Sequence, residues 1–249
     1  RRTSGPKTTL PAAWANGGSK MNENQHLSSQ FEGDLSRLRT SVLQMGGLVE
    51  TQLAAAIDVY SSGGVGSVKQ IVETDRMVND IEKAIDDDCA HLIAKRQPAA
   101  SDLRLVFGIS KIVTDLERAG DEAKQIAKGV RRICEAGEMP AHYGTGVRHI
   151  AEVALGMLRQ ALDAFGRVDA GLARKVILAD ADVDSEFKSI IRQLITHMME
   201  DPRTITTSID MIRIARAVER IGDHAKNVAE HVVYIVEGRD IRHPKGSQA

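Results

Sequence analysis

The chain is poor in aromatic residues and in cysteine. Its 249 residues include one Trp, three Tyr, four Phe and two Cys. So few aromatic rings leave little for stacking on nucleic-acid bases. The spacing of Cys89 and Cys134 matches no zinc or redox motif, and two cysteines make no disulfide framework. We therefore expect both to be small apolar core residues in a reducing compartment.

A charge excess and long apolar runs are also missing. Lys and Arg number 33 and Asp and Glu 34, which gives a formal net charge of −1. Nucleic-acid-binding proteins usually carry a basic excess, so no nucleic-acid partner is expected. No apolar run approaches the roughly 20 residues of a transmembrane helix. These absences predict a soluble cytoplasmic protein.

Proline and glycine divide the chain into long helical segments. None of the six prolines falls inside a periodic segment, and proline breaks helices. Between the breaks, apolar residues recur at three- and four-residue steps, as they do from Ile214 to Val232. Ser101 and Asp201 stand where an N-cap is needed, and Pro202 suits the first helical position. The helices are expected at 28–61, 66–97, 101–136, 145–166, 169–200 and 203–237. Such lengths with short connections predict an all-α antiparallel bundle.

One unit occurs twice in the sequence. Glu117–Ala127 and Glu219–Ala229 share seven of eleven residues at an offset of 102. Upstream the offset is 105, which places Asp75 over Asp180. A three-residue indel between helices reconciles the two offsets, so we expect two tandem three-helix bundles related by pseudo-twofold symmetry. The predicted divisions are a tail or non-native remnant at 1–20, repeats at 21–140 and 141–240, and a tail at 241–249.

Each repeat carries a Glu-x-x-x-Asp pair. Glu117 and Asp121 form the first pair, and Glu219 and Asp223 form the second. A spacing of four places both carboxylates on one helix face, where like charges repel by a few tenths of a kcal/mol. A bound cation would offset that repulsion, because oxygen-rich sites suit hard or borderline metals. Asn227, one turn further along, offers a carbonyl oxygen to the second pair.

The preceding helix of each repeat holds a second acidic row. Asp75 belongs to the first repeat, and Asp180 and Asp184 belong to the second. If the rows face the Glu-x-x-x-Asp pairs, oxygen ligands converge from two helices. Gly120 and Gly222, inside the pairs, each cost about 1 kcal/mol in a helix relative to Ala. Such a cost is tolerable where a neighbouring backbone or an ion cluster must come close.

Three alternatives stay open at this point. The acidic rows could be solvated faces, with ordinary i,i+3 ion pairs from Asp121 to Lys124 and from Asp223 to Lys226. The protein could be a metal-free helical scaffold. It could also be a di-metal carboxylate enzyme, although such enzymes need Glu-x-x-His on two core helices. The histidines show no matching pattern between the repeats, so each is expected to be satisfied or exposed. No catalytic motif appears, so no residue is assigned as catalytic.

Several segments together resemble the PhoU family of bacterial regulators of phosphate-uptake signalling. The motif segments Asp115–Asp121 and Ala217–Asp223 carry most of the resemblance. Met45–Val49, Gln97–Arg104 and Met198–Thr204 fit as well. Both repeats match in order along most of the chain, which makes the resemblance specific.

The resemblance implies two three-helix bundles that usually associate as homodimers. It implies a negative regulator of the phosphate-starvation response rather than an enzyme. Such proteins couple the ATPase subunit of a phosphate ABC transporter to a phosphate-sensing histidine kinase and silence the kinase when phosphate is plentiful. Any membrane association would then be peripheral and would pass through these partners.

The resemblance also implies multinuclear metal clusters at the repeated motif. The ions would be divalent or trivalent, with Mg, Mn, Fe and Zn as candidates. Carried over by position, the ligands would be Glu117, Asp121, Glu219 and Asp223, followed by Asn227, Asp75, Asp180 and Asp184. Gln125 stands where the family pattern has Asn, and Asn79 stands in place of an acid. The first site is therefore predicted to bind metal more weakly than the second.

Overall fold

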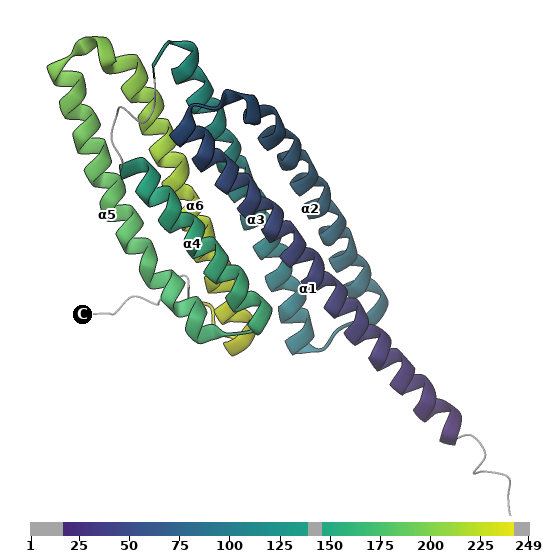
Figure 1. The fold of residues 1–249 in the computed structure, drawn as a ribbon. Helices are drawn as coiled ribbons and strands as arrows, with labels where there is room; N and C mark the ends of the chain where they lie inside the picture. Colours follow the sequence, from purple (N-terminus) through teal and green to yellow (C-terminus); the bar gives the residue numbers. More distant parts are fainter. Residues whose placement is uncertain (1–16, 139–145, 242–249) are drawn as a thin grey trace, which may run out of the picture. The chain divides into compact units, whose positions relative to one another are not determined.

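A computed structural model describes residues 17–138 and 146–241, which form long helices with short connections (Figure 1). The helices are α1 Gly17–Ser62, α2 Val68–Arg96, α3 Ala100–Glu135, α4 Gly146–Arg167, α5 Ala170–Glu200 and α6 Ile205–Glu237. Two 3₁₀ turns, η1 Val65–Ser67 and η3 Pro202–Thr204, lead into α2 and α6. No β-strand occurs in these ranges, so the all-α fold is confirmed.

The helix boundaries follow the sequence signals at most ends. Asp201 caps η3 by accepting a hydrogen bond from the Arg203 amide at 3.0 Å, with Pro202 at the first position. The Ser101 cap is wrong, because α3 begins at Ala100 after Ala99, whose side chain makes no capping bond. Helix α1 begins at Gly17 rather than near 28, because no proline interrupts the chain there although the apolar periodicity starts later.

The chain divides into two compact units, residues 1–37 and 38–249. The described part of the first unit is the beginning of α1. In the second unit, Cys89 is buried, which confirms its place in the core, and Cys134 packs against the core partly buried. Burial raises the pKa of the Cys89 thiol to about 12. Among the described residues, no helix combines the length and apolar character that a bilayer-spanning segment requires.

Helices α3 and α6 pack closely and antiparallel. A Cβ at Gly108 would lie 2.5 Å from Ile235, and one at Gly129 would lie 2.8 Å from Ile214. At either position, any side chain larger than the hydrogen of glycine would displace the neighbouring isoleucine. The facing pairs therefore run in opposite directions along the two helices, and glycine allows the close approach.

The α3–α6 contacts are arranged about repeat-equivalent residues. Arg132 lies twelve residues after Gly120 and contacts Asp210, which lies twelve before Gly222, with 3.1 Å between Arg132 Nε and Asp210 Oδ1. Gly120 and Gly222 occupy the same position in the two repeats. The equal distances along the sequence from these glycines are therefore what an approximate twofold axis between α3 and α6 would produce.

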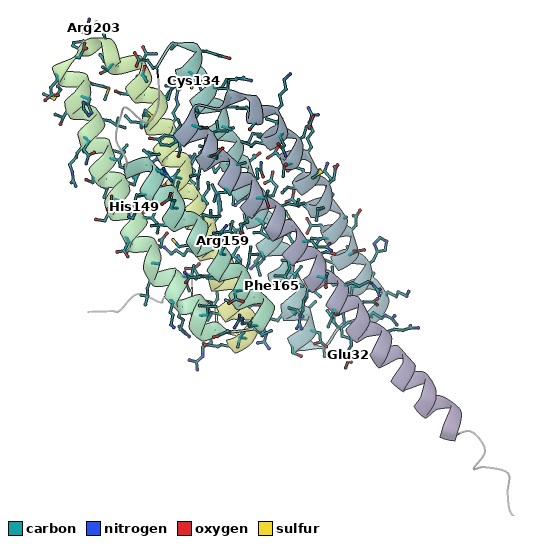
Figure 2. The ribbon with its side chains drawn as sticks, viewed as in Figure 1. Glu32, Cys134, His149, Arg159, Phe165 and Arg203 are labelled. Atoms are coloured by element: carbon teal, nitrogen blue, oxygen red, sulfur yellow. The ribbon has the colours of Figure 1, made fainter. Side chains whose placement is uncertain are left out.

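One apolar core joins the two repeats. A continuous cluster of buried side chains includes Leu53 of α1, Ile126 of α3, Ile150 of α4, Leu194 of α5 and Ile221 of α6. Helix α4 also contacts α1 at the surface, where Arg159, labelled in Figure 2, donates to Glu50 with 2.6 Å between Nε and Oε1. The repeats are therefore halves of one packed body, and the candidate acidic residues lie on α2, α3, α5 and α6.

Candidate functional site

The first acidic cluster lies between α2 and α3 and is joined by a lysine. Asp75 of α2 is only 4% exposed. The Lys124 ammonium of α3 lies 2.6 Å from Asp75 Oδ2 and 2.5 Å from Asp121 Oδ1. From α1, the Gln52 amide donates to the Gly120 carbonyl at 3.1 Å, and Gln52 Oε1 would lie 3.0 Å from a Cβ at Gly120. The glycine thus admits a neighbouring side chain, and the two acidic rows face each other.

Glu117 completes this cluster together with an acid that the sequence interpretation missed. Burial raises the pKa of Glu117, and the charges of Asp121, Glu82 and Asp75 raise it further. Burial also raises the pKa of Glu82, with Asp86 adding to the effect. Glu82 follows Asp75 by seven residues, so it lies on the same face of α2. That spacing was the signal that could have found it.

The second cluster repeats the first between α5 and α6. The Lys226 ammonium lies 2.6 Å from Asp180 Oδ2, as Lys124 does from Asp75. Burial raises the pKa of Asp223, and the charges of Asp180 and Asp184 raise it further. The expected ion pair from Lys226 to Asp223 is replaced by this contact with Asp180, whereas the one from Lys124 to Asp121 forms.

The two clusters differ in charge balance. Arg216 of α6 donates to Glu219 at 3.0 Å and lies over the ring of Phe187 at 4.4 Å. Burial raises the pKa of Glu219, and Arg216 opposes that rise. In the first repeat, Thr114 stands in place of Arg216 and Glu82 in place of Phe187. The second cluster in turn has Asp184 where the first has Asn79, so the two clusters hold equal numbers of carboxylates and differ in this arginine.

These side chains, as placed, do not fit a metal ion. Among the side chains that the structure describes, those of residues 30–138 and 146–241, no three from His, Cys, Asp or Glu are arranged to hold one. Lys124 and Lys226 instead supply positive charge among the carboxylates. Asn227 belongs to neither cluster, because its amide nitrogen donates to Asp115 at 3.0 Å. Metal binding by the eight candidate residues stays a prediction that requires the lysines to withdraw.

A polar network that occurs only once joins α3 to α6. Asp115, which is 5% exposed, accepts from His224 Nδ1 at 3.0 Å, Asn227 Nδ2 at 3.0 Å and His231 Nε2 at 3.3 Å. Burial opposes ionisation, but these hydrogen bonds hold the pKa of Asp115 well below its usual range. The repeat counterpart of Asp115 is Ala217, so repeat matching could not find the network. Both histidines are satisfied, as expected.

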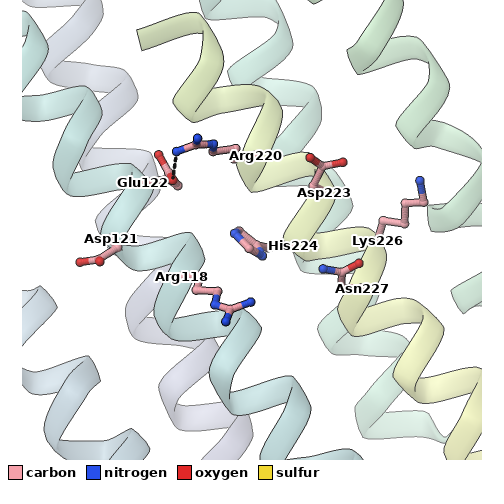
Figure 3. A pocket seen from close by; sticks show the side chains of 8 residues that line it. All are labelled: Arg118, Asp121, Glu122, Arg220, Asp223, His224, Lys226 and Asn227. Atoms are coloured by element: carbon pink, nitrogen blue, oxygen red, sulfur yellow. Dashed lines mark hydrogen bonds and ion pairs between the residues drawn. The ribbon is translucent and has the colours of Figure 1, made fainter. Parts of the chain in front are cut away.

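A groove of about 530 Å³ runs between α3 and α6 (Figure 3). Arg118 and His224 point into the space between the helices, whereas Asp121 points away from α6. Arg220 reaches across to Glu122, with 3.1 Å between Nη1 and Oε1. The acidic clusters therefore flank the groove, and its centre holds arginine, histidine and one paired glutamate.

Two helical repeats that share one core and carry matched charged clusters define a duplicated three-helix-bundle protein. The model of the PhoU domain family matches residues 42–130 and 147–232. Together with the relatives below, this match means that the chain belongs to the PhoU family, as the sequence resemblance indicated.

Similar proteins extend the match over nearly the whole chain. The phosphate-specific transport system accessory protein PhoU homolog of Pseudomonas aeruginosa is 48% identical over 218 residues, which cover 88% of this chain and 90% of the relative. The PhoU accessory protein of Escherichia coli (strain K12) is 41% identical over 228 residues, covering 92% and 94%.

Solved structures agree with the fold. The crystal structure of PhoU from Pseudomonas aeruginosa superposes with a TM-score of 0.81 at 47% identity, covering 84% of this chain and all of that one. The phosphate transport system regulatory protein PhoU from Streptococcus pneumoniae gives 0.78 at 28% identity, covering 86% and 100%.

Proposed function

We propose that this protein is a negative regulator of phosphate uptake and of the phosphate-starvation response. It acts as a cytoplasmic adaptor between the ATPase subunit of a phosphate ABC transporter and a phosphate-sensing histidine kinase. The observation that carries the proposal is the 48% and 41% identity to proteins named as accessory proteins of phosphate-specific transport. The role is regulatory rather than catalytic, and a homodimer is the proposed assembly.

The geometry supports an adaptor because the protein presents two related but unequal charged faces. One face carries Glu117 and Glu82 beside Lys124. The other carries Glu219 with Arg216 over Phe187. Since one core holds both repeats together, contact of a partner with one face fixes the position of the other. Two different partners can therefore be held in a defined relation.

Silencing would work by a shift in the conformational populations of a partner. An adaptor that binds one state of the kinase more tightly biases the kinase toward that state. Moving a partner from 1:99 to 99:1 requires about 10⁴-fold tighter binding to the favoured state. Interfaces of that selectivity need several desolvated contacts, so a double substitution in one cluster should weaken silencing measurably.

The test is co-purification from cells grown at high and at low phosphate. The tagged full chain is compared with the variant Glu219→Ala/Asp223→Ala and with the control Asp87→Ala/Asp163→Ala, which removes two exposed carboxylates elsewhere. We expect the wild type and the control to retain the transporter ATPase and the kinase and to repress a starvation reporter at high phosphate. The cluster variant should lose one partner and derepress. If the wild type retains neither the ATPase nor the kinase at either phosphate level, the adaptor proposal is refuted.

Metal binding is tested separately by metal content after loading and desalting. Weaker metal binding at the first cluster, where Gln125 and Asn79 replace expected ligands, stays the prediction. Glu117→Ala/Asp121→Ala should then lose less bound Mn²⁺ or Zn²⁺ than Glu219→Ala/Asp223→Ala. Equal losses would contradict this order. A wild-type protein that retains no metal after loading and desalting would contradict metal binding altogether.

A further inference from the structure

A second cavity of about 320 Å³ adjoins the groove between α3 and α6. Arg118 and Asn227 line both spaces, so the cavity and the groove adjoin at these two residues. Lys111 of α3 and His231 of α6 also line the second cavity, beside the buried Asp115. Asp115 and His231 are buried, whereas Lys111 and Arg118 are exposed, so the cavity combines a buried polar wall with two solvent-accessible cations.

Two cations converge on this cavity from one face of α3. Lys111 and Arg118 are seven residues apart, so they lie on the same helix face about 10 Å apart along the axis. Both residues line the same cavity, so both positive charges are available to one anion bound there. The Lys111 ammonium lies 5.7 Å from the centre of the Tyr234 ring. Neither cation forms an ion pair with any carboxylate in the described part of the chain.

The nearby carboxylates are already engaged. Asp115 accepts three hydrogen bonds from α6, and Asp86 of α2 accepts the Ser110 hydroxyl at 2.8 Å. Burial raises the pKa of Glu82, and the charge of Arg118 opposes that rise without an ion pair between them. The wall of the cavity thus holds two cations against one carboxylate whose oxygens are committed to other donors.

The approximate symmetry explains why Arg118 lacks a partner. Its repeat counterpart, Arg220, is paired with Glu122 at 3.1 Å. The counterpart of Glu122 is His224, whose Nδ1 is committed to Asp115. Arg118 therefore faces a histidine where Arg220 has a carboxylate partner. A guanidinium presents a planar fork of donors that matches an oxyanion, and charge-assisted hydrogen bonds of this kind are strong.

We propose that the cavity beside Arg118 binds a small tetrahedral oxyanion, either inorganic phosphate or the phosphoryl group of a small metabolite. Arg118 supplies the bidentate contact and Lys111 supplies the second positive charge. The site is distinct from the acidic clusters and needs no metal. It also stands independently of the adaptor function, which the co-purification experiment tests.

The experiment is isothermal titration of the purified full chain in EDTA at constant ionic strength. The probes are inorganic phosphate, glycerol 3-phosphate and sulfate. The variants are Arg118→Gln, Arg118→Lys and Lys111→Gln. Arg131→Gln is the matched control, because Arg131 is an exposed cation on the same helix, paired with Glu135 and outside both cavities. Circular dichroism verifies that each variant is folded.

We expect saturable binding of phosphate or glycerol 3-phosphate by the wild type, and the tighter of the two identifies the source. Loss of a charged hydrogen-bonding partner should weaken binding about tenfold or more in Arg118→Gln. Arg118→Lys and Lys111→Gln should be intermediate, and Arg131→Gln should match the wild type. An absence of saturable binding, equal weakening in Arg131→Gln, or binding that appears only when metal replaces EDTA would overturn the proposal.

Discussion

At Asp115, a buried carboxylate of one repeat accepts hydrogen bonds from three side chains of the other. The side chain of Asn has only one acceptor oxygen, and its NH₂ group would face the hydrogen-bond donors of α6. We expect Asp115→Asn to lower the free energy of unfolding by about 2–4 kcal/mol, because buried groups lose their partners. Urea unfolding followed by circular dichroism measures the change. The exposed Asp163→Asn should stay within about 0.5 kcal/mol of the wild type, and an equal loss in both variants would contradict the role given to Asp115.

Glu117 has the opposite relation between ionisation and folding. Burial raises its pKa in the folded state, so the folded protein binds more protons than the unfolded chain between the two pKa values. Stability therefore falls as the pH rises through this window, above the ordinary Glu pKa of about 4.3, and recovers as the pH falls. In chelator, Glu117→Gln should be more stable than the wild type at pH 7 and should show a shallower dependence between pH 7 and 5, because Glu82, Glu219 and Asp223 still contribute. An unchanged slope in the melting temperature against pH would contradict this.

At the scale of elements, the C-terminus of α6 depends on one glycine. Gly238 caps the helix with φ +71°, and Arg104 lies where its Cβ would be. An L-residue is strained at this φ and would also displace Arg104, so Gly238→Ala should cost about 1–2 kcal/mol.

Gly47 supplies the matched control for that substitution. It lies inside α1, and nothing lies within 4 Å of a Cβ built there. The same change, Gly47→Ala, should stabilise the protein by up to about 1 kcal/mol through helix propensity. Thermal unfolding of the two single variants should therefore give shifts of opposite sign, and shifts of the same sign would show that neither site behaves as described.

The elements themselves were largely predictable, because proline, glycine and apolar periodicity are local signals. Five helices begin and end close to the expected residues. The start of α1 was not predictable, since the helix begins well before the first residue of the apolar pattern. The Asp169 cap of α5, which accepts from the Leu172 amide at 2.9 Å, was also missed. An aspartate followed by Ala and Gly differs little in sequence from a turn.

The acidic clusters were predictable only in part. Duplication placed Glu117 and Glu219 on equivalent faces, and the structure brings both near the acids of the preceding helix. The contacts between helices were hidden, because Lys124 and Lys226 reach Asp75 and Asp180 through side-chain directions that spacing within one helix does not fix. Asp115 was hidden for a different reason, since its partners lie on the other repeat more than a hundred residues away.

For the molecule as a whole, the shared core means that the two repeats should fold together and not as separate domains. The helices of each repeat contribute to one buried cluster, in which Ile214 of α6 meets Gly129 of α3. Separation of the repeats would expose the apolar faces of α3 and α6 to water, at about 25 cal/mol for each Å² uncovered. The marginal stability of domains, about 5–15 kcal/mol, leaves little to absorb such a loss.

We therefore expect that neither residues 21–140 nor residues 141–240 fold stably alone. Each fragment should lack a cooperative thermal transition and should show collapsed amide dispersion by NMR, whereas residues 21–249 should unfold in one transition. Ile214→Ala should lower the stability of that single transition by about 2–5 kcal/mol, because a buried cavity forms at the junction of the repeats. Two separate transitions in residues 21–249, or a cooperative melt of either fragment, would mean that the repeats are independent domains. The fixed relation between the two charged faces, on which the adaptor mechanism depends, would then be lost.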